Sequence, residues 1–305
     1  MTDILYKLPS IYSDVKKSVV AIVSKVSSQP HFPDIIGTGF IAREDGLIFT
    51  CDHVINAIMK LPRRKNAPEE EWPAEVMMFH FVSDKGIAFI PMEIQAVVQT
   101  ALFKPGGYYY GEDLPDLGII RVDFKGLPSL QINPEFNFNE GDLVALSGFP
   151  MGVGTLLAPG WLHQLSPTLQ TGIISAILPH PCKHPHGILM DIMCKGGSSG
   201  SPVFDATTGE VVAMVYGVLN EKKIMSGQGM AVYENSTSLS LAITCNFLER
   251  MLKNIDNIPE FRKQKIEDWK DFYPYIQEKI EKGYYILSPP KEPMLKDKTS
   301  LEEKK

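Results

Sequence analysis

Short apolar runs separated by turn residues make up most of this chain. The runs are rich in valine, isoleucine and leucine, and clusters of glycine, proline, asparagine and aspartate lie between them. We predict strands over residues 18–26, 37–42, 47–50, 76–81, 87–90, 93–98, 117–122, 143–148, 171–178, 188–193, 202–204, 211–218 and 229–233. Many short strands without long helices between them are typical of an all-β barrel or sandwich.

Helical patterns are confined to the two ends of the chain. Residues 4–16 favour a short N-terminal helix, although Pro9 weakens that pattern. After the strand-rich region, four apolar residues recur at helical spacing: Leu241, Cys245, Leu248 and Leu252. Residues 260–282 are charged and favour a helix that Pro274 should kink.

The change of pattern along the chain predicts three parts. We expect a main domain over residues 1–250 and a helical extension over residues 251–290. The last residues, 291–305, are rich in lysine and glutamate, which is typical of a disordered charged tail.

Composition and charge exclude several function classes. The chain has 305 residues and a net charge of −6, so it lacks the basic excess that nucleic acid binding requires. No run of about 18 apolar residues occurs, which predicts no membrane partner. The first residues do not resemble a signal peptide, and we expect a cytoplasmic protein. The cysteines have no framework spacing, so we expect free thiols: Cys51, Cys182, Cys194 and Cys245.

Residues 196–202, Gly-Gly-Ser-Ser-Gly-Ser-Pro, form the most informative segment. Small residues let a substrate approach the backbone, and a serine nucleophile needs free amide groups nearby to hold a developing oxyanion. The same composition also fits an ordinary hairpin turn, so the segment alone leaves both interpretations open.

A nucleophilic serine needs a base and an acid that orients the base. His53 directly follows the predicted strand 47–50, where polar groups are often displayed, although a structural histidine also fits. Asp116 precedes the predicted strand 117–122 and is the candidate acid. Asp113 is a nearby rival, but it fits a loop-capping role better.

Six segments in order resemble motifs of the trypsin-like, chymotrypsin-fold serine proteases, and most closely those of the HtrA/Deg branch. The segments are Gly-Thr-Gly-Phe-Ile at 37–41, Thr-Cys-Asp-His-Val at 50–54, Asp-Leu-Gly-Ile-Ile at 116–120, Gly-Asp-Leu-Val-Ala-Leu-Ser-Gly-Phe-Pro at 141–150, Gln-Thr-Gly-Ile-Ile-Ser-Ala at 170–176 and Gly-Ser-Ser-Gly-Ser-Pro at 197–202. The resemblance covers about residues 15–245.

This chain departs from the HtrA pattern in three ways. Ser201 stands where the family often has glycine. The histidine and the aspartate are farther apart than is usual, and residues 61–75 and 102–115 resemble enlarged loops. No PDZ-sized domain is expected after the main domain.

The resemblance implies two six-stranded antiparallel β-barrels with a short N-terminal helix and C-terminal helices. It implies a serine endopeptidase whose nucleophile is Ser199, with His53 as the base and Asp116 as the acid that orients it. The amides of Gly197 and Ser199 would form the oxyanion hole. The family needs no cofactor or metal, and its partner is a protein or peptide substrate.

The resemblance also implies a specificity pocket near five residues: Met193, Cys194, Val215, Tyr216 and Gly217. Their apolar character predicts cleavage after small or medium apolar residues, and Lys195 is better explained as a solvated loop lysine. Residues 215–217 would pair with the substrate as an added strand.

Regulation by loop ordering is expected, because the Ile-Val-Gly-Gly sequence of trypsin zymogens is absent. The enlarged loops and the C-terminal helices are the candidate regulators. The C-terminal helices could also contact a second copy or a regulatory partner.

Two further interpretations concern a metal site and a scaffold function. The ligand-type residues of 180–186 suggest a metal site, but alternate residues of an extended chain are too far apart for all of them to converge on one ion. A catalytically silent or latent scaffold is the alternative to an active enzyme, because a fold does not ensure a function.

Overall fold

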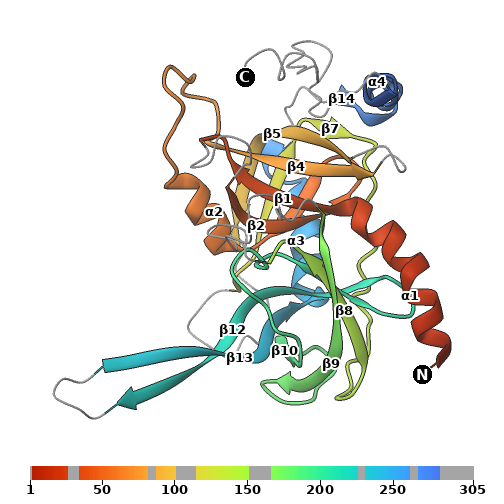
Figure 1. The fold of residues 1–305 in the computed structure, drawn as a ribbon, viewed down its shortest axis with the longest axis vertical. Helices are drawn as coiled ribbons and strands as arrows, with labels where there is room; N and C mark the ends of the chain where they lie inside the picture. Colours follow the sequence, from red (N-terminus) through yellow and green to blue (C-terminus); the bar gives the residue numbers. More distant parts are fainter. Residues whose placement is uncertain are drawn as a thin grey trace, which may run out of the picture.

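Two closed antiparallel β-barrels form the body of the protein in the computed structural model (Figure 1). The structure describes residues 2–26, 34–81, 87–100, 115–150, 166–225, 231–261 and 267–281. Each barrel has six strands, and short helices lie at the two ends of the chain. The predicted fold class is therefore confirmed.

The first barrel is built from apolar strands in the order β1-β2-β3-β6-β5-β4. Its strands are β1 (Val19–Ser24), β2 (Ile35–Arg43), β3 (Leu47–Thr50), β4 (Ala74–Phe81), β5 (Ile87–Gln99) and β6 (Gly118–Val122). All residues of β1, β3 and β6 are buried, which explains their nearly continuous runs of valine, isoleucine and leucine.

The second barrel has the strand order β10-β13-β12-β11-β8-β9. Its strands are β8 (Leu143–Gly148), β9 (Thr168–Leu178), β10 (Gly187–Met190), β11 (Pro202–Asp205), β12 (Val211–Met225) and β13 (Ala231–Thr244). Its core is a separate cluster that includes Val144, Ile188 and Val212.

Helices and two short strands complete the described chain. The N-terminal elements are α1 (Thr2–Val15) and η1 (Lys16–Ser18), and α2 (Asp52–Met59) follows β3. The C-terminal elements are α3 (Cys245–Ile255), η4 (Pro259–Phe261), β14 (Glu267–Asp268) and α4 (Trp269–Glu281). Strand β14 pairs in parallel with β7 (Phe124–Lys125). None of the helices in the described part of the chain is long and apolar enough to span a bilayer.

Three expectations from the sequence need correction. Leu241 does not begin the C-terminal helix, because it pairs with Leu189 and Gly217 within the sheet and the helix starts at Cys245. The strands predicted at 87–90 and 93–98 are one strand, β5. Strands β12 and β13 are much longer than predicted, because they pair with each other from Ala213 to Met225.

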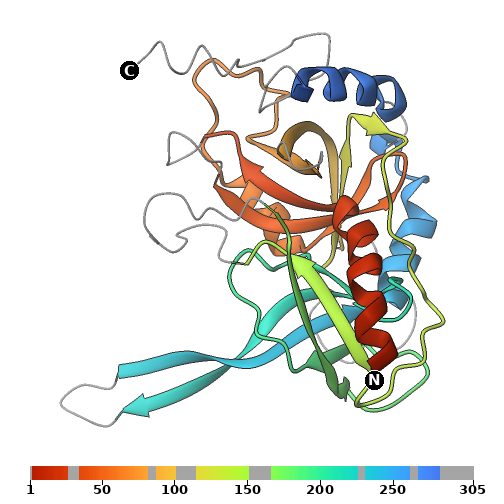
Figure 2. The same cartoon turned by 45° about the vertical axis from the view of Figure 1, so that its right-hand side comes forward.

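The last C-terminal elements, η4, β14 and α4, pack on the first barrel (Figure 2). The Phe124 and Phe272 rings lie 5.4 Å apart between centroids, and Trp269 meets Phe124 edge-on at 6.2 Å. The buried Arg121 donates to the Phe261 carbonyl at 2.9 Å and pairs with Asp45 at 2.9 Å. Buried aromatic area and a buried cation therefore hold this segment in place.

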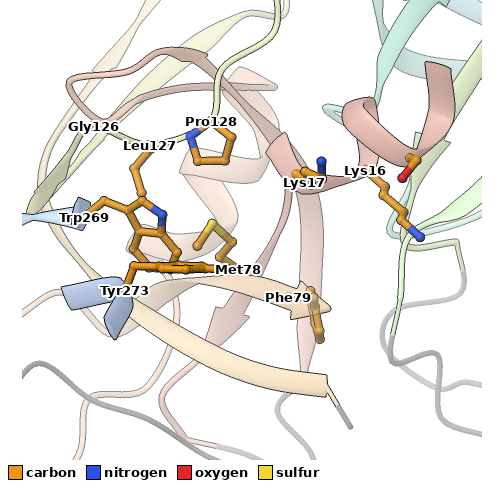
Figure 3. A pocket seen from close by; sticks show the side chains of 10 residues that line it. Lys16, Lys17, Met78, Phe79, Gly126, Leu127, Pro128, Trp269 and Tyr273 are labelled. Atoms are coloured by element: carbon orange, nitrogen blue, oxygen red, sulfur yellow. The ribbon is translucent and has the colours of Figure 1, made fainter. Parts of the chain in front are cut away.

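A pocket of about 530 Å³ lies between η1, β4 and α4 (Figure 3). Met78, Leu127, Trp269 and Tyr273 line its apolar part. The predicted site residues do not line it.

Strands β12 and β13 continue beyond the second barrel as a two-stranded ribbon that projects from the body (Figures 1 and 2). We call the paired segments Asn220–Met225 and Ala231–Ser236 the arm. Register shifts between Val215 and Gly217 and between Val218 and Asn220 lie at its base. Such bulges bend a strand and increase its twist, so they change the direction of the ribbon where it leaves the barrel.

Candidate active site

Barrel pairing brings His53 and Asp116 together. Strands β3 and β6 are neighbours with Thr50 opposite Gly118, so the residues just after β3 lie beside those just before β6. His53 stands in the first turn of α2, and its Nδ1 lies 2.5 Å from Asp116 Oδ2. The His53 amide also donates to Asp116 Oδ1 at 3.0 Å. Both carboxylate oxygens therefore fix the histidine, one through the ring and one through the backbone.

The Asp116 carboxylate also sets the protonation of the ring. Its hydrogen bond raises the pKa of His53, while burial acts in the opposite direction. In the neutral ring, a proton on Nδ1 faces Asp116 and leaves Nε2 as the acceptor. That tautomer is the one a general base needs.

The segment around Ser199 is a tight turn in which two positions, Gly197 and Gly200, require glycine. The Ser198 amide donates to the Lys195 carbonyl at 3.0 Å, and Gly197 has a φ of 92°, as the third residue of a type II turn requires. Gly200 has a φ of 90°, and a Cβ there would lie 2.0 Å from the Thr38 carbonyl oxygen. Among the described residues, neither the Gly197 nor the Ser199 amide has a hydrogen-bond acceptor.

Ser199 and the histidine segment flank the same residue, Gly37. A Cβ on Gly37 would lie 3.3 Å from the Ser199 carbonyl oxygen and 2.8 Å from a methyl group of Val54, which follows His53. Within the ranges that the structure describes, no hydrogen bond joins the Ser199 hydroxyl to the His53 ring. His53 and Asp116 are thus bonded to each other, and the Ser199 turn packs against the same glycine as the segment that follows His53.

A comparison with protein families identifies the family of this chain. The sequence model of the trypsin-like peptidase domain matches residues 37–214, more than half of the chain and the whole region that holds His53, Asp116 and Ser199. The chain belongs to the trypsin-like peptidase family. As a member, it is a serine endopeptidase. No curated protein matches the sequence significantly.

Solved structures of HtrA-type proteases are similar in outline. The HtrA-type protease AlgW with a decapeptide is 18% identical, with a TM-score of 0.47, and the match covers 82% of this chain and 67% of that one. A variant of AlgW with a tripeptide is also 18% identical, with a TM-score of 0.47, covering 81% of this chain and 63% of that one.

Thr38 ties the first barrel of this trypsin-like peptidase to the Ser199 turn. Its amide donates to the Ser199 carbonyl at 2.9 Å, and its hydroxyl donates to the Gly197 carbonyl at 2.7 Å. The same hydroxyl accepts from the buried Phe149 amide at 3.0 Å. This role was not predicted from the sequence, although a threonine between two glycines in a largely apolar strand is a visible signal.

The Val215 carbonyl links the segment that holds His53 to the turn that holds Ser199. It accepts the Gly200 amide at 2.8 Å and the Cys51 thiol at 3.2 Å. Burial is the main cause that raises the pKa of Cys51 well above its usual range, so the thiol keeps the proton that it donates. Cys51, two residues before His53, and Gly200, directly after Ser199, therefore share one acceptor.

Cys51, His53 and Asp116 also offer ligand atoms within 4.8 Å of one another. A metal ion requires the thiolate, whereas the buried Cys51 thiol is protonated and bonded to the Val215 carbonyl. The donor set fits hydrogen bonding better than metal binding. In the rest of the described chain, no other such group of ligand atoms occurs, and the residues of 180–186 do not converge.

The predicted pocket residues differ in their accessibility. Met193 is 46% exposed, and its carbonyl accepts from the Gln170 side chain at 3.0 Å. Cys194 and Val215 are 2% and 1% exposed, and their side chains belong to the core of the second barrel. Tyr216 and Gly217 are half-buried. Met193, Tyr216 and Gly217 are thus at least partly accessible, whereas the side chains of Cys194 and Val215 are buried. Asp113 lies outside the described residues.

Proposed function

We propose that this serine endopeptidase works with Ser199 as nucleophile, His53 as general base and Asp116 as the acid that holds His53. The observation that carries the proposal is the His53–Asp116 pair beside a turn with two open amides. These are the parts that acyl transfer requires: a base in the correct tautomer, a serine and preorganised donors.

In the proposed reaction, Ser199 Oγ attacks the scissile carbonyl carbon while His53 Nε2 takes the hydroxyl proton. The Gly197 and Ser199 amides stabilise the oxyanion, and each such donor contributes about 3–4 kcal/mol to transition-state stabilisation. His53 then gives its proton to the leaving amine. Water, activated by the same nitrogen, releases the acyl group and restores Ser199.

Gating by loop ordering is part of the proposal. The Ser199 hydroxyl has no bond to His53 in the described structure, so a small movement must close the pair before reaction. Binding of substrate, or ordering of residues 61–75 and 102–115, would supply this movement. Residues 101–114 lie outside the described part of the chain. The same observation favours a latent scaffold as the second candidate function.

The proposed specificity is for small or medium apolar residues before the scissile bond. The exposed Met193 supports it, since a thioether side chain suits apolar contacts. A peptide-library profile dominated by arginine or lysine would contradict this part of the proposal.

A contact with a second copy or a regulator through the C-terminal helices is proposed as well. Helix α4 packs on the barrel through Trp269 and Phe272, whereas Tyr273 is 38% exposed on it. Sedimentation of Tyr273→Ser beside the wild type tests whether this surface joins copies.

Fluorophosphonate labelling tests the proposed nucleophile. We expect labelling of the wild type, loss in Ser199→Ala and strong reduction in His53→Ala. Ser201→Ala is the matched control, because the Ser201 hydroxyl is buried without a partner among the described residues. Equal labelling of the wild type and Ser199→Ala would refute the assignment, and labelling that requires an added activator would favour the latent form.

A further inference from the structure

Among the described strands, none pairs with one edge of β12 over most of its length. On that edge β12 pairs with β11 only up to Met214, opposite Pro202. Next comes the nucleophile turn, where the Val215 amide donates to the Ser201 carbonyl at 3.0 Å and the Val215 carbonyl accepts the Gly200 amide at 2.8 Å. From Gly217 to Met225 only β13, on the other edge, pairs with β12 among the described strands.

The space beside this edge is accessible at its base. A Cβ built on Gly217 would meet no atom of the described residues within 4 Å, and Leu219 is 42% exposed. The Thr237 hydroxyl donates to the Leu219 carbonyl at 2.7 Å from the β13 side, which holds the bulge at the base of the arm. At about 3.3 Å per residue, the open edge is roughly 30 Å long.

A two-stranded ribbon that projects into water is marginal by itself, and its unpaired amides and carbonyls are a template for a third strand. Here the template continues directly from the turn that holds Ser199. We propose that the Gly217–Met225 edge binds an extended segment of the substrate polypeptide by β-strand addition, far beyond the residues next to the scissile bond. This inference rests on the proposed function.

The direction of β12 decides which part of the substrate binds. The strand runs from the nucleophile turn outward to the end of the arm. An antiparallel substrate strand runs back toward Ser199, so the residues on the N-terminal side of the scissile bond lie along the arm. Main-chain hydrogen bonds supply the affinity for the substrate strand. Binding is therefore tolerant of the substrate sequence and requires an extended conformation.

Three matched peptides and a variant with a shortened arm test the inference. The variant replaces residues 221–235 with Asn-Gly, a two-residue hairpin turn between the paired Asn220 and Ser236. The first peptide carries no extension. The second carries an extension of eight residues on the N-terminal side of the scissile bond, and the third carries the same extension on the C-terminal side. Anisotropy measures their binding to Ser199→Ala with and without the arm, and kcat/KM is measured on the active forms.

We expect the N-terminal extension to improve binding and kcat/KM roughly tenfold to a hundredfold, and removal of the arm to abolish that gain. The C-terminal extension should give no gain. Equal binding of short and N-extended peptides, or a gain that survives in the shortened variant, would overturn the inference. Absence of cleavage and labelling with the binding gain intact would instead refute the proposed function alone.

A scan with single backbone N-methyl groups on the N-terminal extension needs no variant. Strand addition predicts losses at every second position, because alternate amides face the partner strand. Losses without this period would contradict main-chain pairing. Sedimentation adds one more test: an arm-dependent dimer with unchanged peptide binding would show that a second copy, not substrate, occupies the edge.

Discussion

The Thr38 hydroxyl offers a sharp test of how the first barrel holds the nucleophile turn. Thr38→Val keeps the β-branched shape and removes one oxygen. That oxygen donates to the Gly197 carbonyl at 2.7 Å and accepts the buried Phe149 amide at 3.0 Å. Thr38→Ser keeps both bonds and is the matched control.

The magnitude follows from the two lost bonds. A buried amide left without an acceptor costs about 1–3 kcal/mol, and the bond to Gly197 contributes about 1 kcal/mol. We therefore expect Thr38→Val to lower the free energy of unfolding by about 2–4 kcal/mol, which is a large part of a typical total of 5–15 kcal/mol. Because the Gly197 carbonyl is released, the oxyanion amides lose their fixed direction, and kcat should fall about tenfold to a hundredfold.

Urea unfolding and the rate of fluorophosphonate labelling measure the two effects separately. Thr38→Ser should lie within about 1 kcal/mol of the wild type and label at a similar rate. A Thr38→Val protein that labels as fast as the wild type would refute the role of this hydroxyl in positioning the turn.

Three further predictions test the electrostatics. Since Asp116 raises the pKa of His53, kcat/KM should rise with pH through a midpoint above the usual histidine value of about 6.5, and Asp116→Asn should lower that midpoint as well as the rate. Burial raises the pKa of Asp123 to about 7, so its ionisation destabilises the fold as pH rises from about 4 to 7. Asp123→Asn should therefore stabilise the protein by roughly 4 kcal/mol at pH 8 and by roughly 1–2 kcal/mol at pH 5, and an equal gain at both pH values in urea unfolding would contradict this prediction. Arg121→Met leaves the buried Phe261 carbonyl without this donor and should cost about 1–3 kcal/mol, whereas a loss below about 1 kcal/mol would show that the C-terminal segment is held by other contacts.

The barrels were predictable because their signals are local, and the same kind of local signal led to Ser199 as a candidate. Each strand carries its own apolar run, and the glycines around Ser199 are required by backbone geometry at their own positions, with a φ near 90° at Gly197 and Gly200. The pairing of His53 with Asp116 needed the family resemblance, because nothing local says that β3 and β6 are neighbours.

The missed features depend on contacts between distant segments. Thr38 and the Val215 carbonyl act on residues more than a hundred positions away in the chain, so no window of sequence contains both partners. The arm was missed for another reason: polar residues such as Glu221 and Lys222 interrupt the apolar run that predicts a strand.

Mapping the fluorophosphonate adduct by mass spectrometry tests the central claim most directly. The account predicts one adduct, on Ser199, in the wild type and in Ser201→Ala, and almost none in His53→Ala. An adduct on another serine, or undiminished modification of Ser199 without His53, would contradict it.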